Sequence, residues 1–145
     1  PGVAGSGSIQ DTFCTLLDLA PTFYEVAGVE YPKEWKGNSP KPLLGESLIP
    51  MLSGNVSQVH HENYVFGMEH AGQAMLRKGN WKILNHERPF DKSNFELFDL
   101  SKDIAEQNDL RKEFPEKYQE MLLEWEKWSE QVGVVLPLPN SSEED

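Results

Sequence analysis

The chain is poor in the residue types that cross-link small proteins or carry them into membranes. It has a single cysteine, Cys14, among 145 residues, so an internal disulfide and the cross-linked framework of small secreted domains are excluded. No segment approaches the roughly 20 consecutive apolar residues of a membrane-spanning helix, and no stretch has the pattern of a signal peptide. We therefore expect one domain of ordinary size, or a small domain joined to a segment of another, and no membrane partner.

Basic side chains are also scarce. Lys and Arg number 13 against 24 Asp and Glu, which gives a formal net charge of −11 at pH 7. Such a surface repels the phosphate backbone of nucleic acids, so we expect no nucleic-acid partner. It attracts no anionic substrate over long distances either, and any anion must be bound through local contacts. The stretch 137–145 ends in Glu-Glu-Asp, and its composition predicts a disordered acidic tail.

The beginning of the chain contains one predicted helix. The apolar run 13–17 is typical of a short strand, after which Asp18 can cap a helix with Pro21 in its first turn. Gly28 supplies the left-handed residue at which such a helix ends. Residues 30–44, rich in Pro, Lys and Gly, indicate an exposed connection. One or two further helical turns are predicted between Gly45 and Gly54.

The second half of the chain predicts a sheet covered by a helix. Period-2 alternation and turn residues predict four strands, at about 63–69, 72–78, 80–86 and 94–100. Between the second and third, Gly79-Asn80 suits a primed hairpin turn because both residues tolerate positive φ. Short connections of this kind imply antiparallel pairing. Apolar residues recur at three- and four-residue spacing over about 115–131, which predicts an amphipathic helix that covers one face of the sheet.

Five short motifs occur in a fixed order along these elements. They are Asp18-Leu19-Ala20-Pro21-Thr22 with Ala27-Gly28, Gly45-Glu46-Ser47-Leu48 with Pro50, the hairpin from Arg77 to Lys82, the segment Glu96-Leu97-Phe98-Asp99-Leu100 with Asp103, and Glu106-Gln107-Asn108-Asp109-Leu110. Their order and spacing resemble the C-terminal region of the type I, formylglycine-dependent sulfatases, and most closely that of the bacterial arylsulfatases.

The resemblance implies an α+β fold. A four-stranded antiparallel sheet is packed against a long C-terminal helix, and both are preceded by a helix that belongs to the alkaline-phosphatase-like catalytic domain. The implied divisions are the tail end of the catalytic α/β domain (1–29), a connection with a short helix (30–58), the C-terminal subdomain (59–136) and the acidic tail (137–145).

The resemblance also implies that the intact protein hydrolyses a sulfate ester, with a formylglycine nucleophile and a calcium ion held in a larger N-terminal domain. Cys14 is followed by Thr-Leu-Leu-Asp and lacks the C/S-x-P-x-R motif from which formylglycine is made, so we expect a buried core thiol. We predict no catalytic residue, no metal ligand and no cofactor site in this chain. The fragment alone is expected to have no sulfatase activity.

One polar run suggests an alternative role as a metal site. His60-His61-Glu62 contains residue types that bind transition metals, but adjacent residues of an extended segment point to opposite faces. An exposed polar lead into the first strand is therefore the favoured interpretation.

A second polar group could hold a sulfate. Arg77, Lys78 and Lys82 are the only local basic cluster, but strand alternation places Arg77 and Lys78 on opposite faces. We therefore favour the interpretation that these three residues are surface charges, or that they form ion pairs with Asp99 and Asp103.

The hairpin tip around residues 68–72 is the candidate for substrate contact. Loops of the C-terminal subdomain of sulfatases border the catalytic cleft and help to select the group that carries the sulfate, as the resemblance implies. Glu69 and His70 could hydrogen-bond a sugar or a phenol there. The alternative is a solvated turn, because polar residues at a hairpin tip need no functional explanation.

The predicted partner is the missing N-terminal catalytic domain. A homodimer of the fragment, formed through an exposed sheet edge or the helix after Asp18, is the alternative. Two other hypotheses are a stand-alone binding or oligomerisation module without catalysis and a regulatory relic that has lost its catalytic half. Analogy with the family suggests a periplasmic or secreted protein, and the sequence does not identify the substrate.

Overall fold

The computed structural model describes residues 4–5, 7 and 9–136. The chain divides into two compact units, Pro1–His61 and Glu62–Asp145. The predicted acidic tail 137–145 lies outside the described residues. None of the helices in the described part of the chain is both long and apolar enough to cross a membrane.

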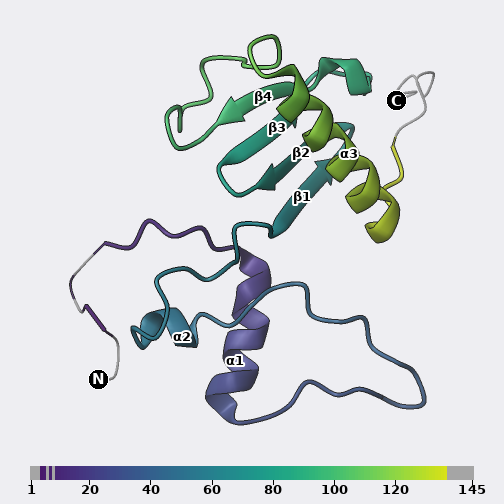
Figure 1. Cartoon of the computed structure of the whole chain (residues 1–145). Coiled ribbons are helices and arrows are strands. Elements are labelled where there is room, and N and C mark those ends of the chain that lie inside the picture. Colours follow the sequence, from purple (N-terminus) through teal and green to yellow (C-terminus); the bar gives the residue numbers. More distant parts are fainter. Residues whose placement is uncertain (1–3, 6, 8, 137–145) are drawn as a thin grey trace, which may run out of the picture. The chain divides into compact units, whose positions relative to one another are not determined.

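The described residues of the first unit form three short helices, of which Figure 1 labels α1 and α2. They are the 3-10 helix η1 (Leu16–Asp18) and the α-helices α1 (Leu19–Ala27) and α2 (Ile49–Leu52). Gly28 ends α1 as predicted, with φ +63° and its N–H donating to the Glu25 and Tyr24 carbonyls. Loops connect these elements, apart from one isolated bridge between Trp35 and Asn38.

The predicted strand at 13–17 is wrong. Thr15 caps η1 instead: its hydroxyl accepts from the Leu17 N–H, and its own N–H donates to the Asp18 carboxylate. Leu16, in the middle of the apolar run, is 83% exposed. A capping box between Thr15, inside the run, and Asp18, directly after it, therefore decides the conformation of this segment.

The second unit is a four-stranded antiparallel sheet with a helix, as predicted. Its strands lie in the order β1-β2-β3-β4, and α3 crosses one face of the sheet in Figure 1. The 3-10 helix η2 precedes β4. The bounds are β1 (Val65–His70), β2 (Gln73–Lys78), β3 (Trp81–Asn85), η2 (Lys92–Asn94), β4 (Glu96–Asp99) and α3 (Pro115–Val132).

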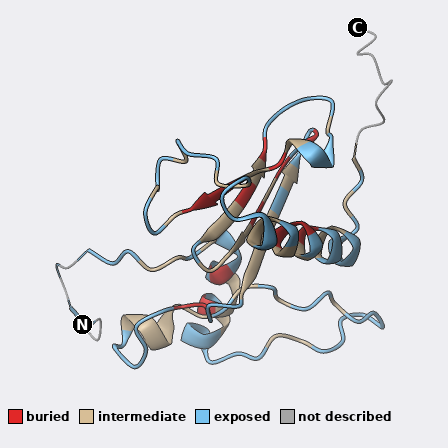
Figure 2. Ribbon diagram, turned by 45° about the horizontal axis from the view of Figure 1, so that its top comes forward, coloured by how far each residue is buried: buried red, intermediate tan, exposed pale blue. Residues whose placement is uncertain are grey.

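The core of this unit lies between the sheet and α3. Alternate residues of the strands point to this face, because successive side chains of a strand lie on opposite sides. The three buried residues of α3 lie within five positions of one another and form one face of the helix. Figure 2 shows buried residues along the strands and on one side of α3. The buried cluster consists of Ala74, Leu76, Ile83, Phe95, Leu97, Met121, Leu122 and Trp125.

Two tight hairpins set the register of the sheet. Ala71 and Gly72 connect β1 to β2 with φ of +51° and +81°, which is the pattern of a type I′ turn. Gly79 leads the second hairpin with φ +58°, so the predicted turn at Gly79-Asn80 is confirmed. Both turns twist in the direction that the paired strands require.

Candidate functional site

The predicted substrate-contact residues lie at the tip of the first hairpin and point to opposite faces of the sheet. Glu69 shares its face with Gly67, which lies against Trp128 of α3, whereas His70 lies on the other face. One carboxylate oxygen of Glu69 accepts from the Gly72 N–H at 2.8 Å, so Glu69 stabilises the turn. His70 is exposed and is the freer of the two to meet a ligand.

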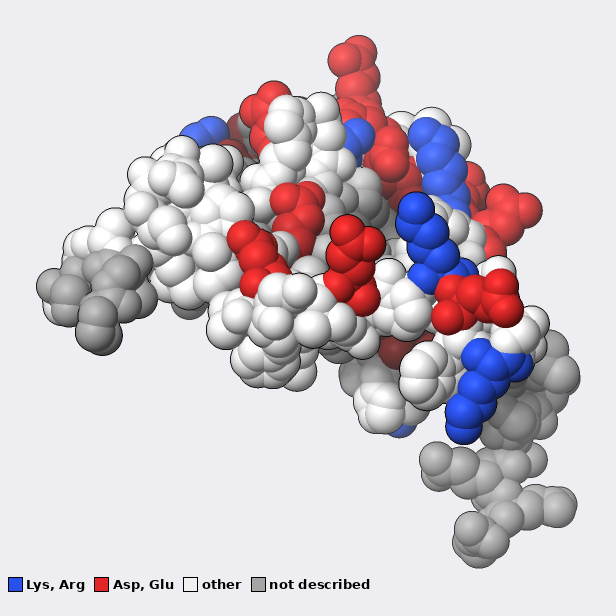
Figure 3. Space-filling model, turned by 90° about the horizontal axis from the view of Figure 1, so that it is seen from below, with Lys and Arg blue, Asp and Glu red and all other residues white. Residues whose placement is uncertain are grey.

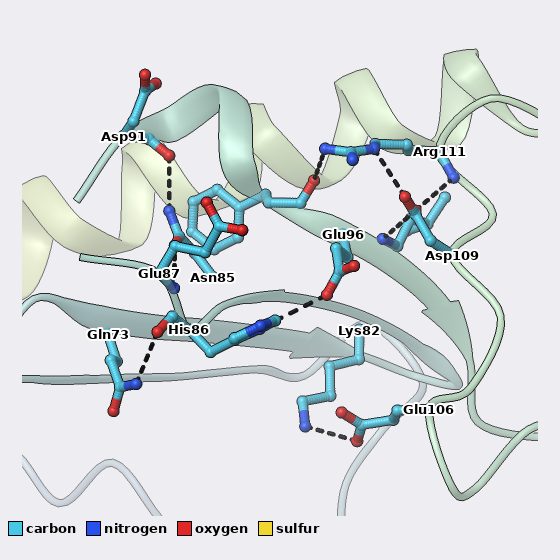
Figure 4. Close-up of polar contacts among 12 residues, drawn as sticks. Gln73, Lys82, Asn85, His86, Glu87, Asp91, Glu96, Glu106, Asp109 and Arg111 are labelled. Carbon is cyan, nitrogen blue, oxygen red and sulfur yellow. Dashed lines mark hydrogen bonds and ion pairs between the residues drawn. The ribbon is translucent and has the colours of Figure 1, made fainter. Parts of the chain in front are cut away.

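Neighbouring polar groups extend this edge of the sheet, and Figure 4 shows them. Gln73, paired with His70 in the strand register, donates from its side chain to the His86 carbonyl at 2.8 Å. His86 Nδ1 lies 3.6 Å from a carboxylate oxygen of Glu96. Hydrogen-bonding groups of Gln73, His86 and Glu96 thus lie on the face of the sheet that carries His70. Only the strand register brings Gln73 and His86 together, because they lie 13 residues apart in the sequence.

The two lysines of the basic cluster pair with carboxylates, and Arg77 donates from Nε to the Gly79 carbonyl at 2.8 Å. Lys78 lies on the α3 face, where its Nζ contacts Glu120 at 3.2 Å and Glu124 at 3.3 Å. Burial alone would lower the pKa of Lys78, but these two carboxylates outweigh it and raise the pKa above its ordinary value. Lys82 points to the other face and pairs with Glu106 at 2.6 Å. The predicted pairs with Asp99 and Asp103 are therefore wrong for these two lysines.

A buried polar junction in the first unit is the feature that sequence reasoning missed. The Asp18 carboxylate is fully buried and accepts from the Thr15 N–H at 2.6 Å and the Glu46 N–H at 2.9 Å. His60 Nε2 lies 2.9 Å from the same carboxylate. Because a carboxylate only accepts, this nitrogen carries the proton of the hydrogen bond.

Thr22 continues this junction one helical turn later. Its hydroxyl donates to the Asp18 carbonyl at 2.6 Å and accepts from the Leu48 N–H at 2.9 Å. Asp18 and Thr22 thus hold two amide groups of the segment 46–48. These contacts give a physical reason for the co-occurrence of the Asp-x-x-Pro-Thr and Gly-x-Ser-Leu motifs.

The junction is structural. The side chains of His60 and Asp18 are only 4% and 0% exposed, so no substrate can reach the pair. The expectation of an exposed lead at His60 is wrong, since His60 is buried against Asp18. Asp18 does not cap α1 through its side chain, contrary to the prediction, because its carboxylate turns back to Thr15 and across to Glu46.

Two further expectations concern metals and Cys14. In the part of the chain that the structure describes, no group of three or more His, Cys, Asp or Glu side chains could hold a metal ion. Cys14 is exposed, so the prediction of a buried core thiol is wrong for this chain. Leu16 and Leu17 of the same run are exposed as well.

The junction makes the folding stability of the first unit depend on pH. Burial favours the neutral Asp18 carboxyl, but hydrogen bonds from Thr15, Glu46 and His60 outweigh burial and hold its pKa below the ordinary value of 3.8. The carboxylate therefore stabilises the fold fully above that ordinary value, and this contribution is lost as the pH falls through the lower folded pKa. Asp18→Asn should cost about 1 to 3 kcal/mol at pH 7 and weaken this dependence.

Hydrogen exchange at the Thr15 and Glu46 amides measures this effect directly. Both amides should exchange faster in Asp18→Asn at pH 7. The matched control is Asp11→Asn, which removes an exposed carboxylate and should leave both rates unchanged. Equal protection in wild type and Asp18→Asn would contradict the role given to the carboxylate.

The sequence matches the family described as N-sulphoglucosamine sulphohydrolase, C-terminal, over residues 1–131. It is 32% identical over 128 residues to an uncharacterized sulfatase of Schizosaccharomyces pombe, covering 88% of this chain and 23% of that protein. Arylsulfatase K of Xenopus laevis is 36% identical over 120 residues, with 79% and 22% covered. The N-acetylglucosamine-6-O-sulfatase of Bacteroides thetaiotaomicron is 28% identical over 127 residues, with 84% and 22% covered.

A solved structure shares this fold. The crystal structure of Ps i-CgsB in complex with k-i-k-neocarrahexaose aligns with a TM-score of 0.58 at 25% identity, covering 81% of this chain and 24% of that protein. This chain therefore spans about a quarter of the length of the proteins that it matches.

Proposed function

Because the chain belongs to the sulfatase family, whose C-terminal region it matches over residues 1–131, we propose that it is the C-terminal part of an enzyme that hydrolyses sulfate esters. The match to the family over nearly the whole chain is the observation that carries this proposal. Three segments have separate roles in it. Residues 1–29 form the end of the catalytic α/β domain, residues 30–58 form a connection, and residues 59–136 form the C-terminal subdomain.

The chemical step is assigned to residues that precede this chain in the longer protein. A formylglycine nucleophile requires the C/S-x-P-x-R motif, which the sequence around Cys14 lacks. Calcium requires six or more oxygen ligands, and the described residues provide no cluster of the kind. The residues present fit neither a formylglycine nucleophile nor a calcium site, so we assign no step of the hydrolysis to this chain.

The contribution of this chain is to border the substrate cleft. In the proposal, the tip of the β1–β2 hairpin lies at the cleft, where Glu69 fixes the turn and His70 contacts the group that carries the sulfate. Gln73 and His86 supply further hydrogen-bonding groups on the face of His70. The relatives named above include an N-acetylglucosamine-6-O-sulfatase and a protein bound to a hexaose, which supports a sulfated carbohydrate as the substrate class.

An activity assay tests the proposal. The 145-residue chain should release no 4-nitrophenol from 4-nitrophenyl sulfate above a heat-denatured control. A protein expressed from the same locus with the upstream reading frame should do so, and replacing the Cys or Ser of its C/S-x-P-x-R motif should abolish turnover. Turnover by the chain alone, or an upstream frame without such a motif, would overturn the assignment.

A second candidate is association of the fragment with a copy of itself. The apolar side of α1 is exposed, with Leu19 39%, Phe23 65% and Val26 69% accessible. Exposed apolar surface of this kind is covered in stable proteins by another domain or by a partner. In the first proposal the preceding domain covers it. A mass that rises with concentration in sedimentation of the isolated chain, and that Phe23→Glu abolishes, would support self-association.

A further inference from the structure

The long loop between α1 and α2 is closed by contacts at its base. At its base, the Tyr31 hydroxyl donates to the Lys41 carbonyl at 2.9 Å. The Tyr31 ring packs edge-on against Tyr24 of α1, with ring centroids 5.4 Å apart. The loop is therefore closed into a ring of eleven residues, 31–41, and tied to the helix before it.

The tip of this loop is a tight turn closed by a backbone bridge between Trp35 and Asn38. Trp35 and Asn38 exchange both backbone hydrogen bonds, at 2.8 Å and 3.1 Å. Lys36 and Gly37 between them have φ of +52° and +79°, and the Asn38 side chain donates to the Lys36 carbonyl at 3.2 Å. A lysine in the left-handed region is strained, and strain of this kind is concentrated at functional sites.

The turn presents a tryptophan to solvent. Trp35 is 63% exposed, although Trp81, Trp125 and Trp128 of the second unit all take part in the core or pack against it. The Lys36 ammonium lies 5.8 Å from the centroid of the Trp35 ring, within the range of a cation–π contact. The ring is thus held next to a positive charge while most of its surface remains open.

Basic side chains of the first unit gather on the same loop. Lys33, Lys36 and Lys41 are the only Lys or Arg residues in positions 1–61, and residues 31–41 carry a formal net charge of +2, counting Glu34. All three lysines are exposed. The whole chain carries −11, and the face in Figure 3 shows Asp and Glu side chains spread over it, with Lys and Arg side chains beside some of them. Screening limits such charges to a range of about 10 Å, so a local cationic loop can bind an anion that the whole protein repels.

We propose that the loop 31–41 is a binding site for sulfated polysaccharide, with Trp35 stacking on a sugar ring and Lys33, Lys36 and Lys41 contacting sulfate groups. An aromatic face suits the apolar C–H face of a pyranose. An ammonium group is a compact charge with three donors, which suits a sulfate without fixing one orientation. The inference rests on the proposed function for its ligand class, but it concerns residues 31–41 of the first unit and not Glu69 or His70 of the second.

Affinity electrophoresis tests the proposal on the 145-residue chain. Dextran sulfate in the gel should retard the protein, whereas neutral dextran should not. Trp35→Ala should weaken the apparent affinity about tenfold, and Lys33→Gln/Lys36→Gln/Lys41→Gln should abolish retardation. Added NaCl should weaken binding of the wild type, because the contacts are ionic.

A matched triple variant controls for charge. Lys102→Gln/Lys112→Gln/Lys127→Gln removes three exposed lysines of the second unit and should leave retardation unchanged. Circular dichroism of each variant should match the wild type, since every altered side chain is exposed. Equal loss in both triple variants, or no retardation of the wild type, would overturn the proposal. So would a Trp35→Ala variant that changes sedimentation but not retardation, because it would show that Trp35 contacts protein.

This result is independent of the activity assay. If the longer protein hydrolyses sulfate esters and the chain does not bind dextran sulfate, the loop inference fails alone. If the chain binds and the longer protein shows no sulfatase activity, the proposed enzyme function fails.

Discussion

Trp125→Ala is expected to destabilise the second unit by about 3 to 5 kcal/mol, a large part of the total stability of a domain of this size. Trp125 is 3% exposed at the centre of the interface between α3 and the sheet. Its ring lies 5.3 Å from the rings of Phe95 and Trp128 and 6.2 Å from that of Phe90. Truncation removes these contacts and leaves a cavity that neighbouring strands cannot fill.

Urea unfolding followed by far-UV circular dichroism measures the change. The midpoint should fall in Trp125→Ala, with a smaller fall in Trp125→Phe, which keeps an aromatic ring in the cluster. Trp35→Ala is the matched control, because it removes the same side chain from an exposed position and should change the free energy of unfolding by less than about 0.5 kcal/mol. Equal midpoints for Trp125→Ala and Trp35→Ala would show that α3 does not depend on this contact.

The second unit could be predicted because its signals are local. Alternation in 73–78 and 81–85 places residues such as Leu76 and Ile83 on one face, and both are fully buried. The three- and four-residue spacing of apolar residues in α3 likewise predicts that Met121 and Trp125 lie on one face of the helix, and both are buried. These patterns hold because the sheet and the helix that bury each other lie within one stretch of chain.

The first unit was harder to predict because its burial depends on residues distant in sequence. The apolar run 13–17 resembles a strand, yet Leu16 is exposed and Leu16–Asp18 form the 3-10 helix η1. The spacing of Thr15 and Asp18 is that of a capping box, and this signal could have predicted η1. No local pattern predicts that His60 meets Asp18, since 42 residues separate them.

The candidate site was predicted only in part. The sequence places Glu69 and His70 at a hairpin tip, but only the structure shows that Glu69 is engaged by the Gly72 N–H. The neighbouring Gln73 and His86 come from the register of β1, β2 and β3, which turn geometry fixes. Trp35 falls within the exposed connection predicted for residues 30–44, but its tight turn depends on the left-handed φ of Lys36, a conformation that the sequence does not specify.

Gly45→Ala is expected to disrupt the junction of the first unit. A Cβ at this position would lie 2.2 Å from the Leu17 carbonyl oxygen and 2.6 Å from the Asp18 nitrogen. Both are backbone atoms of η1, so neither can rotate away as the end of a side chain could. The segment 45–48 must move off η1, which would break the bonds from the Glu46 and Leu48 amides to Asp18 and Thr22.

The expected cost of Gly45→Ala is roughly 3 kcal/mol or more, because overpacking adds to the buried acceptors left without donors. Hydrogen exchange should show lost protection at Glu46 and Leu48, while α3 keeps its own. Gly37→Ala is the matched control: the same methyl group meets nothing within 4 Å there, and only the strain of a positive φ is added. Wild-type protection at Glu46 in Gly45→Ala would show that the close approach of Gly45 to Leu17 does not hold the two motifs together.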